Sequence, residues 1–175
     1  MKKYLIALLT SLLLVTGCAT SVTSDIMVDS EADATIKFSG YKTYTWLGSA
    51  SILYDPAGKW EPPGFDADAE IKFLIDRELR ARGMSEDLAN PGLIVVFAAG
   101  IDMAAMREEI DPESHIAALE NVPEGAITVV LIDAATGFAV WAGLATGEIQ
   151  ENPEADVVKQ RLDYAVSEMF KLLPE

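Results

Sequence analysis

The sequence has little of two residue types on which many functional sites depend. Its 175 residues include one cysteine, Cys18, and one histidine, His115. A single cysteine excludes a scaffold held together by disulfides. One cysteine and one histidine also leave little material for a Ser-His-Asp or Cys-His catalytic arrangement.

Basic residues are scarce as well. Lys and Arg number 13 against 28 Asp and Glu, which gives a formal net charge of −15 and a pI near 4.3. Such a chain repels phosphate groups, which argues against nucleic acid and anionic lipid headgroups as partners. The hydrophobic fraction of 50% and the charged fraction of 23% are typical of a folded globular domain. The length fits one domain, or one domain with appendages.

Internal repeats are also missing, which excludes a solenoid. Long apolar runs are missing as well. The longest apolar run, Tyr4–Val15, has 12 residues with two polar interruptions, fewer than the roughly 20 that a membrane-spanning helix needs. Lys2 and Lys3 precede this run, and Thr16-Gly17-Cys18 follows it. This order is typical of a secretory signal peptide, which we predict for residues 1–17.

The end of this segment, Val15, Thr16, Gly17 and Cys18, resembles the lipobox of bacterial lipoproteins. The resemblance implies cleavage between Gly17 and Cys18, a diacylglyceryl thioether on Cys18, and a fatty acyl group on the new amino terminus. Several acyl chains anchor a protein firmly in a membrane. Because Ala19 rather than Asp follows the cysteine, the sorting convention favours the outer membrane, facing the periplasm of a Gram-negative host. The alternative is an ordinary secreted protein with a buried cysteine.

Residues 18–32 are rich in Ser, Thr and Asp and predict a lipidated tether, whereas residues 33–175 predict one domain. The expected elements are one bent or two short strands over 35–47, a loop over 48–65, a helix over 66–82, a strand from 93 towards 103, a short helix over 112–120, a hairpin of 127–132 and 138–149, and a helix over 152–173. This order predicts an α+β fold. We expect an antiparallel or mixed sheet of about four to five strands, with two main helices packed on one face.

Apolar periodicity supports these assignments. Leu93–Phe97 and Ile127–Ile132 are continuous apolar runs, typical of strands buried on both faces. Between residues 66 and 82 the apolar residues instead form one helical stripe, which Gly83 ends with a left-handed cap. Phe73 lies off that stripe, so we expect it to pack under a loop or to contribute to an interface.

Several short motifs resemble the lipoprotein family called domain of unknown function 4136. They are Phe38 and Tyr41 followed by Thr43-Tyr44-Thr-Trp46, then Ile75-Asp76 with Leu79 and Gly83, and finally Glu124-Gly125 through Asp133 to Val140-Trp141-Ala-Gly143. The likeness covers about residues 28–174. It implies an envelope lipoprotein domain without an established activity. Residues 103–122 depart from the family pattern, because they are rich in Met, Ala and Glu.

Two possible catalytic or metal-binding patterns are weak. Ser39 and Lys42 match the S-x-x-K spacing of serine acyl enzymes, but strand alternation puts them on opposite faces and the companion motifs are missing. His115 lies among the acids Glu108, Glu109, Asp111 and Glu113, yet no metal-binding spacing is present, so a solvated acidic surface is the simpler interpretation. We therefore assign no catalytic residue, metal ligand or cofactor.

The leading hypothesis is a lipid-anchored, non-enzymatic domain that binds another envelope component or helps an assembly. Trp60, in a loop rich in Pro and Gly, and Phe73 are its candidate contact residues. An anchored enzyme or metal-binding protein that uses the acidic residues of 102–113 is the alternative. A third hypothesis, a carrier of a small ligand, requires an apolar cavity between the sheet and the helices.

Overall fold

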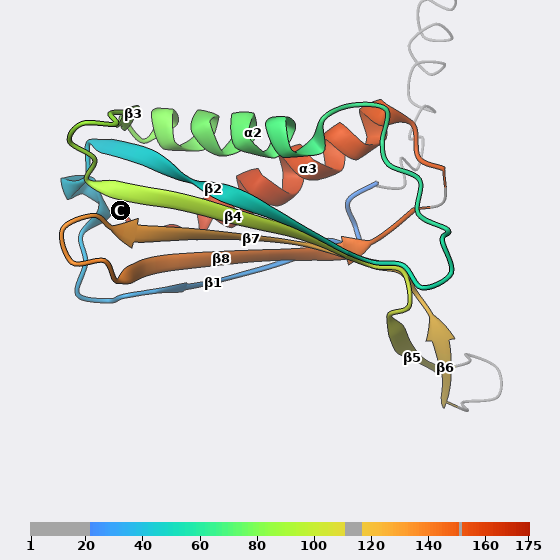
Figure 1. Cartoon of the computed structure of the whole chain (residues 1–175). Coiled ribbons are helices and arrows are strands. Elements are labelled where there is room, and N and C mark those ends of the chain that lie inside the picture. Colours follow the sequence, from blue (N-terminus) through green and yellow to red (C-terminus); the bar gives the residue numbers. More distant parts are fainter. Residues whose placement is uncertain (1–21, 111–116, 151) are drawn as a thin grey trace, which may run out of the picture.

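The computed structural model describes residues 22–110, 117–150 and 152–175 (Figure 1). In chain order its elements are β1 (Met27–Ala32), the short 3-10 helix η1 (Phe38–Gly40), β2 (Thr43–Tyr54), α2 (Ala67–Ala81), β3 (Ser85–Glu86), β4 (Leu93–Asp102), β5 (Met106–Ile110), β6 (Ala117–Asn121), β7 (Glu124–Asp133), β8 (Ala139–Glu148) and α3 (Ala155–Lys171).

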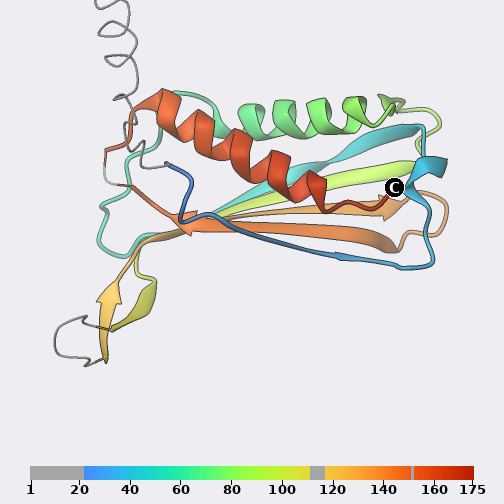
Figure 2. The same ribbon diagram turned by 180° about the vertical axis from the view of Figure 1, so that it is seen from behind.

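Six strands form one mixed sheet in the order β1-β8-β7-β4-β2-β3, and β5 pairs with β6 in a separate hairpin. Strand β2 is parallel to β4, and α2 lies between them in the chain. The neighbours β4–β7, β7–β8 and β8–β1 are antiparallel. Both helices pack on the same face of the sheet, as Figures 1 and 2 show from opposite sides. The α+β fold and the single helical layer are confirmed, but the strands are more numerous than predicted.

The core lies between this sheet and the helices. Alternate residues of the strands point into it, and α2 contributes the predicted stripe, namely Ile71, Leu74, Ile75 and Leu79, all of them buried. Asp66 caps α2 by accepting a 2.9 Å hydrogen bond from the backbone N–H of Ala69. At the other end Gly83 has a φ of 81°, the left-handed conformation expected of the cap.

Three segments differ from their predicted structure. Residues 117–120, predicted as the end of a short helix, belong to strand β6, whereas residues 111–116 lie outside the described part of the chain. Phe38–Gly40 is a 3-10 turn rather than part of a strand. Residues 48–54, predicted as the start of a loop, continue β2, because they pair with β4 as far as Tyr54.

The domain also begins earlier than predicted. Residues 27–32, which the composition assigns to the tether, form β1 and pair with β8 in continuous antiparallel register. Their burial alternates between exposed and partly buried. This is the pattern of an edge strand with one face on the core. The boundary at residue 33 is therefore wrong as a structural boundary.

Candidate functional site

An apolar cavity of about 190 Å³ lies between the sheet and the two helices. It is at the end of the domain where the N-terminal segment enters. Its walls come from the last residues of β4 and β8, the first residues of β7, the N-terminal turns of α2, and α3 as far as Ala165. Loop residues complete them, namely Trp60 and Pro63 before α2 and Ile149, Gln150 and Pro153 before α3. Ile26, just before β1, closes one side. This is the kind of cavity that the ligand-carrier hypothesis requires.

The cavity exists because the side chains at this end of the layer are small. Alanine stands at several of the wall positions, namely Ala67, Ala99, Ala145 and Ala165. At the other end of the same layer, Trp141 and Phe170 fill the space, with their ring centroids 5.3 Å apart. Because the backbones keep a similar spacing, small residues leave a void where large ones would meet.

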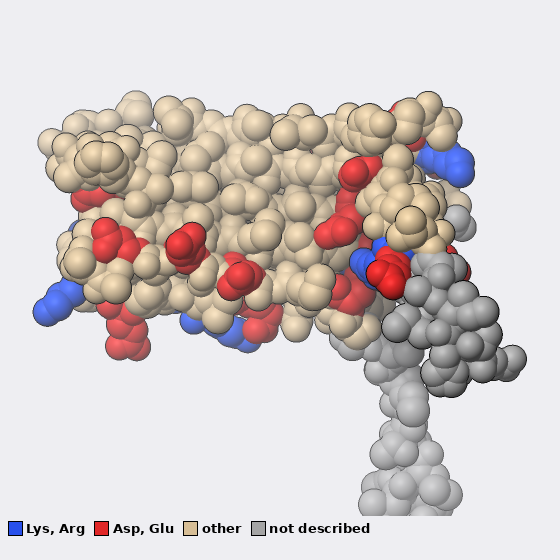
Figure 3. All heavy atoms as spheres, turned by 90° about the horizontal axis from the view of Figure 1, so that it is seen from below, with Lys and Arg blue, Asp and Glu red and all other residues tan. Residues whose placement is uncertain are grey.

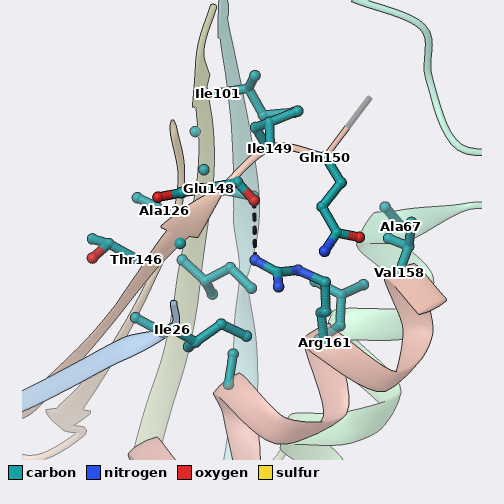
Figure 4. Close-up of a pocket in the computed structure, with 18 of the residues that line it drawn as sticks. Ile26, Ala67, Ile101, Ala126, Thr146, Glu148, Ile149, Gln150, Val158 and Arg161 are labelled. Carbon is teal, nitrogen blue, oxygen red and sulfur yellow. Dashed lines mark hydrogen bonds between the residues drawn. The ribbon is translucent and has the colours of Figure 1, made fainter. Parts of the chain in front are cut away.

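One largely buried cation, Arg161, with its side chain 12% exposed, lies at the edge of the cavity. The Arg161 guanidinium donates two hydrogen bonds to the carboxylate of Asp25, at 2.7 and 2.6 Å, and one of 3.0 Å to the carbonyl of Glu148 (Figure 4). It also donates to the carbonyl of Val22. The hydrogen bond from Arg161 lowers the pKa of Asp25 to about 2, so this carboxylate is ionised at neutral pH. Arg161 therefore fixes the N-terminal segment to α3 and leaves the cavity itself apolar.

Comparison with known proteins identifies the fold family. The model of a domain of unknown function, DUF4136, matches residues 28–175. The chain belongs to the DUF4136 family. A search of curated proteins finds no match.

Solved structures share the fold of this DUF4136 domain. A DUF4136 family protein from Bacteroides thetaiotaomicron has a TM-score of 0.54 at 11% identity, over 84% of this chain and 95% of that one. A PDZ domain protein from Parabacteroides distasonis has the same TM-score at 14% identity over 86% of this chain, which spans only 36% of that protein. A lipoprotein from Neisseria meningitidis matches at 9% identity with a TM-score of 0.43, over 74% and 98% of the two chains. These likenesses concern the fold alone.

The Tyr44 and Trp46 motif residues of the DUF4136 domain meet Asp76 inside the fold. Asp76, 6% exposed, accepts hydrogen bonds from the Tyr44 hydroxyl at 2.7 Å, the Trp46 indole at 2.9 Å and the Lys72 ammonium at 3.0 Å. Burial raises the pKa of Asp76, but these hydrogen bonds outweigh it and hold the pKa below its usual value. Burial, and secondarily Asp76, raises the pKa of the Tyr44 hydroxyl. The group is a saturated structural network rather than a reactive one.

Two further motif positions are structural as well. The Tyr41 hydroxyl donates a 2.7 Å hydrogen bond to Asp133, whose other carboxylate oxygen organises the β7–β8 turn by accepting from Thr136. Burial first, and then Asp133, raises the pKa of Tyr41 to about 12. Gly143 faces the core, where the side chains of Trp141 and Met169 leave no room for a Cβ atom. The residues that carry the family resemblance thus have structural roles, in the β7–β8 turn and in the contacts of the sheet with its helices.

The two predicted contact residues lie in different places. Trp60 is half-buried and lines the cavity, and its backbone N–H donates a 2.7 Å hydrogen bond to Asp55 that fixes the loop. Phe73 is 57% exposed on α2 and does not line the cavity. The other wall residues were not foreseen, since each is an ordinary small or apolar residue of its own helix or strand.

The acidic segment does not form a metal site in the described part of the chain. Within those residues no group of three or more His, Cys, Asp or Glu side chains converges. Asp102 and Glu108 are exposed on strands of different sheets. His115, with Asp111 and Glu113, lies outside the described residues, as do Gly17 and Cys18. Among the described helices, none is both long and apolar enough to cross a bilayer.

Proposed function

We propose that this DUF4136 domain is a non-enzymatic envelope lipoprotein, anchored to the outer membrane through Cys18 and facing the periplasm, that holds one fatty acyl chain in its cavity. The observation that carries the proposal is an apolar cavity located where the chain leaves the domain towards Cys18. Because Cys18 is only four positions before Val22, with three residues between them, an extended connection reaches at most about 14 Å. The cavity would therefore lie close to the membrane surface.

The size and chemistry of the cavity favour an acyl chain over other ligands. Its volume of about 190 Å³ is smaller than the roughly 300–1,000 Å³ of sites for drug-sized molecules, but apolar cavities near this size bind small apolar ligands. The cation at its edge, Arg161, is already paired with Asp25, so it is not free to bind an anionic ligand. A slender apolar ligand fits this small volume and does not need a free cation to bind.

The anchor is tested by replacing its attachment atom. In cells supplied with a tritiated fatty acid, we expect wild-type protein to be labelled and to sediment with the outer membrane. Cys18→Ser removes the sulfur that forms the thioether, so the label and the outer-membrane fractionation are expected to be lost. A Ser21→Cys variant in the Cys18→Ser background should not restore them, since its cysteine lacks the preceding lipobox residues. Equal labelling of wild type and Cys18→Ser would contradict lipidation at this residue.

The cavity is tested with a fatty acid that carries a photoreactive diazirine. After illumination of cells fed with this probe, we expect mass spectrometry to find adducts on peptides of the cavity wall. Ala165→Leu places three additional carbons in the void, and we expect it to reduce these adducts at least about tenfold. The matched control, Ala81→Leu at an exposed position of α2, should leave them unchanged.

The Cys18→Ser variant distinguishes the two sources of the acyl chain. Adducts that persist in it come from a free lipid, and adducts that disappear come from the anchor of the protein itself. Adducts confined to surface peptides, or equal in Ala165→Leu and wild type, would contradict acyl binding in the cavity without affecting the case for the anchor.

A further inference from the structure

The face of the sheet opposite the helices is apolar and uncharged. Along β2, β4, β7 and β8 its larger side chains include Ile52, Val96, Val130 and Leu144, and the intervening positions are mostly Ala, Thr and Gly. Away from the strand ends, none of the outward residues of these four strands is charged. Figure 3 shows that the middle of this broad face has no charges, and that acidic side chains lie along one border and at one end. Ile52 and Leu144 are 64% and 41% exposed.

This uncharged face is unexpected in a chain with a net charge of −15. Its central strands, moreover, have the sequence of strands that are covered on both sides. Leu93–Phe97 and Ile127–Ile132 are apolar on both faces, yet the helices cover only the face of Leu93, Val95 and Phe97. Ile94 and Val96 remain partly exposed. The prediction that these strands are buried on both faces is therefore wrong for one copy of the chain.

We infer that this face packs against the same face of a second copy, forming a dimer of two sheets. Four strands about 4.8 Å apart and about 30 Å long define a surface of about 600 Å² per copy, so that pairing would bury about 1,200 Å² in total. That is the lower limit of a specific, stable interface. A flat layer of β-branched and small side chains suits the sheet-on-sheet packing of a β-sandwich, in which the layers are about 10 Å apart.

Charge favours a second copy over another partner. The uncharged face offers no counter-charge to a basic or acidic protein, and burial of a partner's unpaired charge against it would be costly. An identical face has no charge to bury. Asp29 and Glu31, which point outward from β1, form the acidic border. If the twofold axis of the dimer is parallel to the strands, this border lies opposite the β2 edge of the partner and not opposite its β1 edge. The two β1 borders then do not meet, whereas the strand-end acids Asp102, Glu124 and Glu148 of the two copies lie at the same end of the dimer.

The same axis keeps the two N-terminal segments at one end of the dimer. Two copies anchored in one membrane require this arrangement, so the choice of axis rests on the proposed function. The pairing of the faces itself does not, because it follows from the apolar surface.

The inference is tested with the full chain in the membranes of the cells that make it. Thr128→Cys places a thiol near the centre of the face, and a short bismaleimide that spans about 10 Å should link two copies. The expected adduct has twice the mass of the chain. The unsubstituted chain and Phe73→Cys, on the helical side, are measured alongside and should give only background.

A charge on the face should separate the copies. Adding Val130→Lys to Thr128→Cys is expected to reduce the double-mass adduct at least about tenfold, because pairing would bury an unpaired ammonium group of each copy. Adding Phe73→Lys instead should leave the adduct unchanged. Thermal unfolding of the Val130→Lys variant verifies that the domain remains folded. An adduct no stronger than that of Phe73→Cys, one of any other mass, or one insensitive to Val130→Lys would overturn the inference.

Discussion

Replacing Asp76 with alanine is expected to lower the free energy of unfolding by about 3–5 kcal/mol, the largest effect of any single substitution considered for this domain. The carboxylate is the common acceptor for Tyr44, Trp46 and Lys72. Its removal leaves the fully buried Tyr44 hydroxyl without an acceptor, in addition to the lost charge pairing. For a domain of this size the midpoint of thermal unfolding should fall by roughly 10 °C.

The comparison with Asp76→Asn adds a dependence on pH. The pKa of Asp76 is lower in the folded protein than its usual value, so the ionised carboxylate stabilises the fold at neutral pH. That contribution is complete above the usual pKa and is lost as pH falls through the folded-state pKa. The difference in stability between wild type and Asp76→Asn should therefore be constant near neutral pH and decrease as the pH falls below about 4.

Asp68→Ala is the matched control for this position. Asp68 lies on the same helix, but it accepts hydrogen bonds from Ser51, an exposed residue. Its loss should cost less than about 1 kcal/mol. Equal losses for the two alanine variants, measured by chemical denaturation, would mean that the buried network around Asp76 does not hold the sheet to α2.

Gly143→Ala should lower the free energy of unfolding by about 1–3 kcal/mol, although it adds only one carbon. A Cβ atom at this position would lie 2.5 Å from the Trp141 ring and 2.6 Å from the Met169 sulfur, both well inside van der Waals contact. Trp141 and Met169 are almost completely buried, so neither can turn outward to make room. Either β8 must move away from α3 or the two side chains must repack.

Two further variants show whether this contact is the cause. Gly100→Ala, in β4, should change stability by less than about 1 kcal/mol, since its Cβ atom would meet nothing within 4 Å. Met169→Ala creates a cavity and is itself destabilising, but in its background the cost of Gly143→Ala should fall by about 1 kcal/mol or more. Additive costs in this double-mutant cycle would show that Met169 is not the obstacle.

The parts of the fold that the sequence predicts are those with local signals. The apolar stripe and glycine cap defined α2 to within a residue at each end, and the turn at Gly137 placed the β7–β8 hairpin. Strand β1 has no such signal. Its outward residues are Met27, Asp29 and Glu31, and only pairing with β8, more than 100 residues away, makes the segment a strand. Composition alone therefore assigned it to a tether.

The cavity is still less visible in the sequence. Each of its walls is a normal stretch of helix, strand or loop, and the void arises only because small residues from several of them meet in one place. Ala99, Ala145 and Ala165 are separated by 46 and 20 residues, and nothing local relates them. Trp60 was singled out because a loop aromatic has less core to enter, and it is the one predicted contact that lines the cavity.

The clamp between Arg161 and Asp25 also has a mechanical consequence. A tensile load applied to the amino terminus reaches the guanidinium of Arg161 before it reaches β1, and from there it passes into α3 and the end of β8. Beyond this ion pair, the load acts along β1 and therefore shears the hydrogen bonds between β1 and β8. These hydrogen bonds share the load instead of breaking one after another. A domain held in this way can be pulled from its amino terminus without being peeled apart from its first strand.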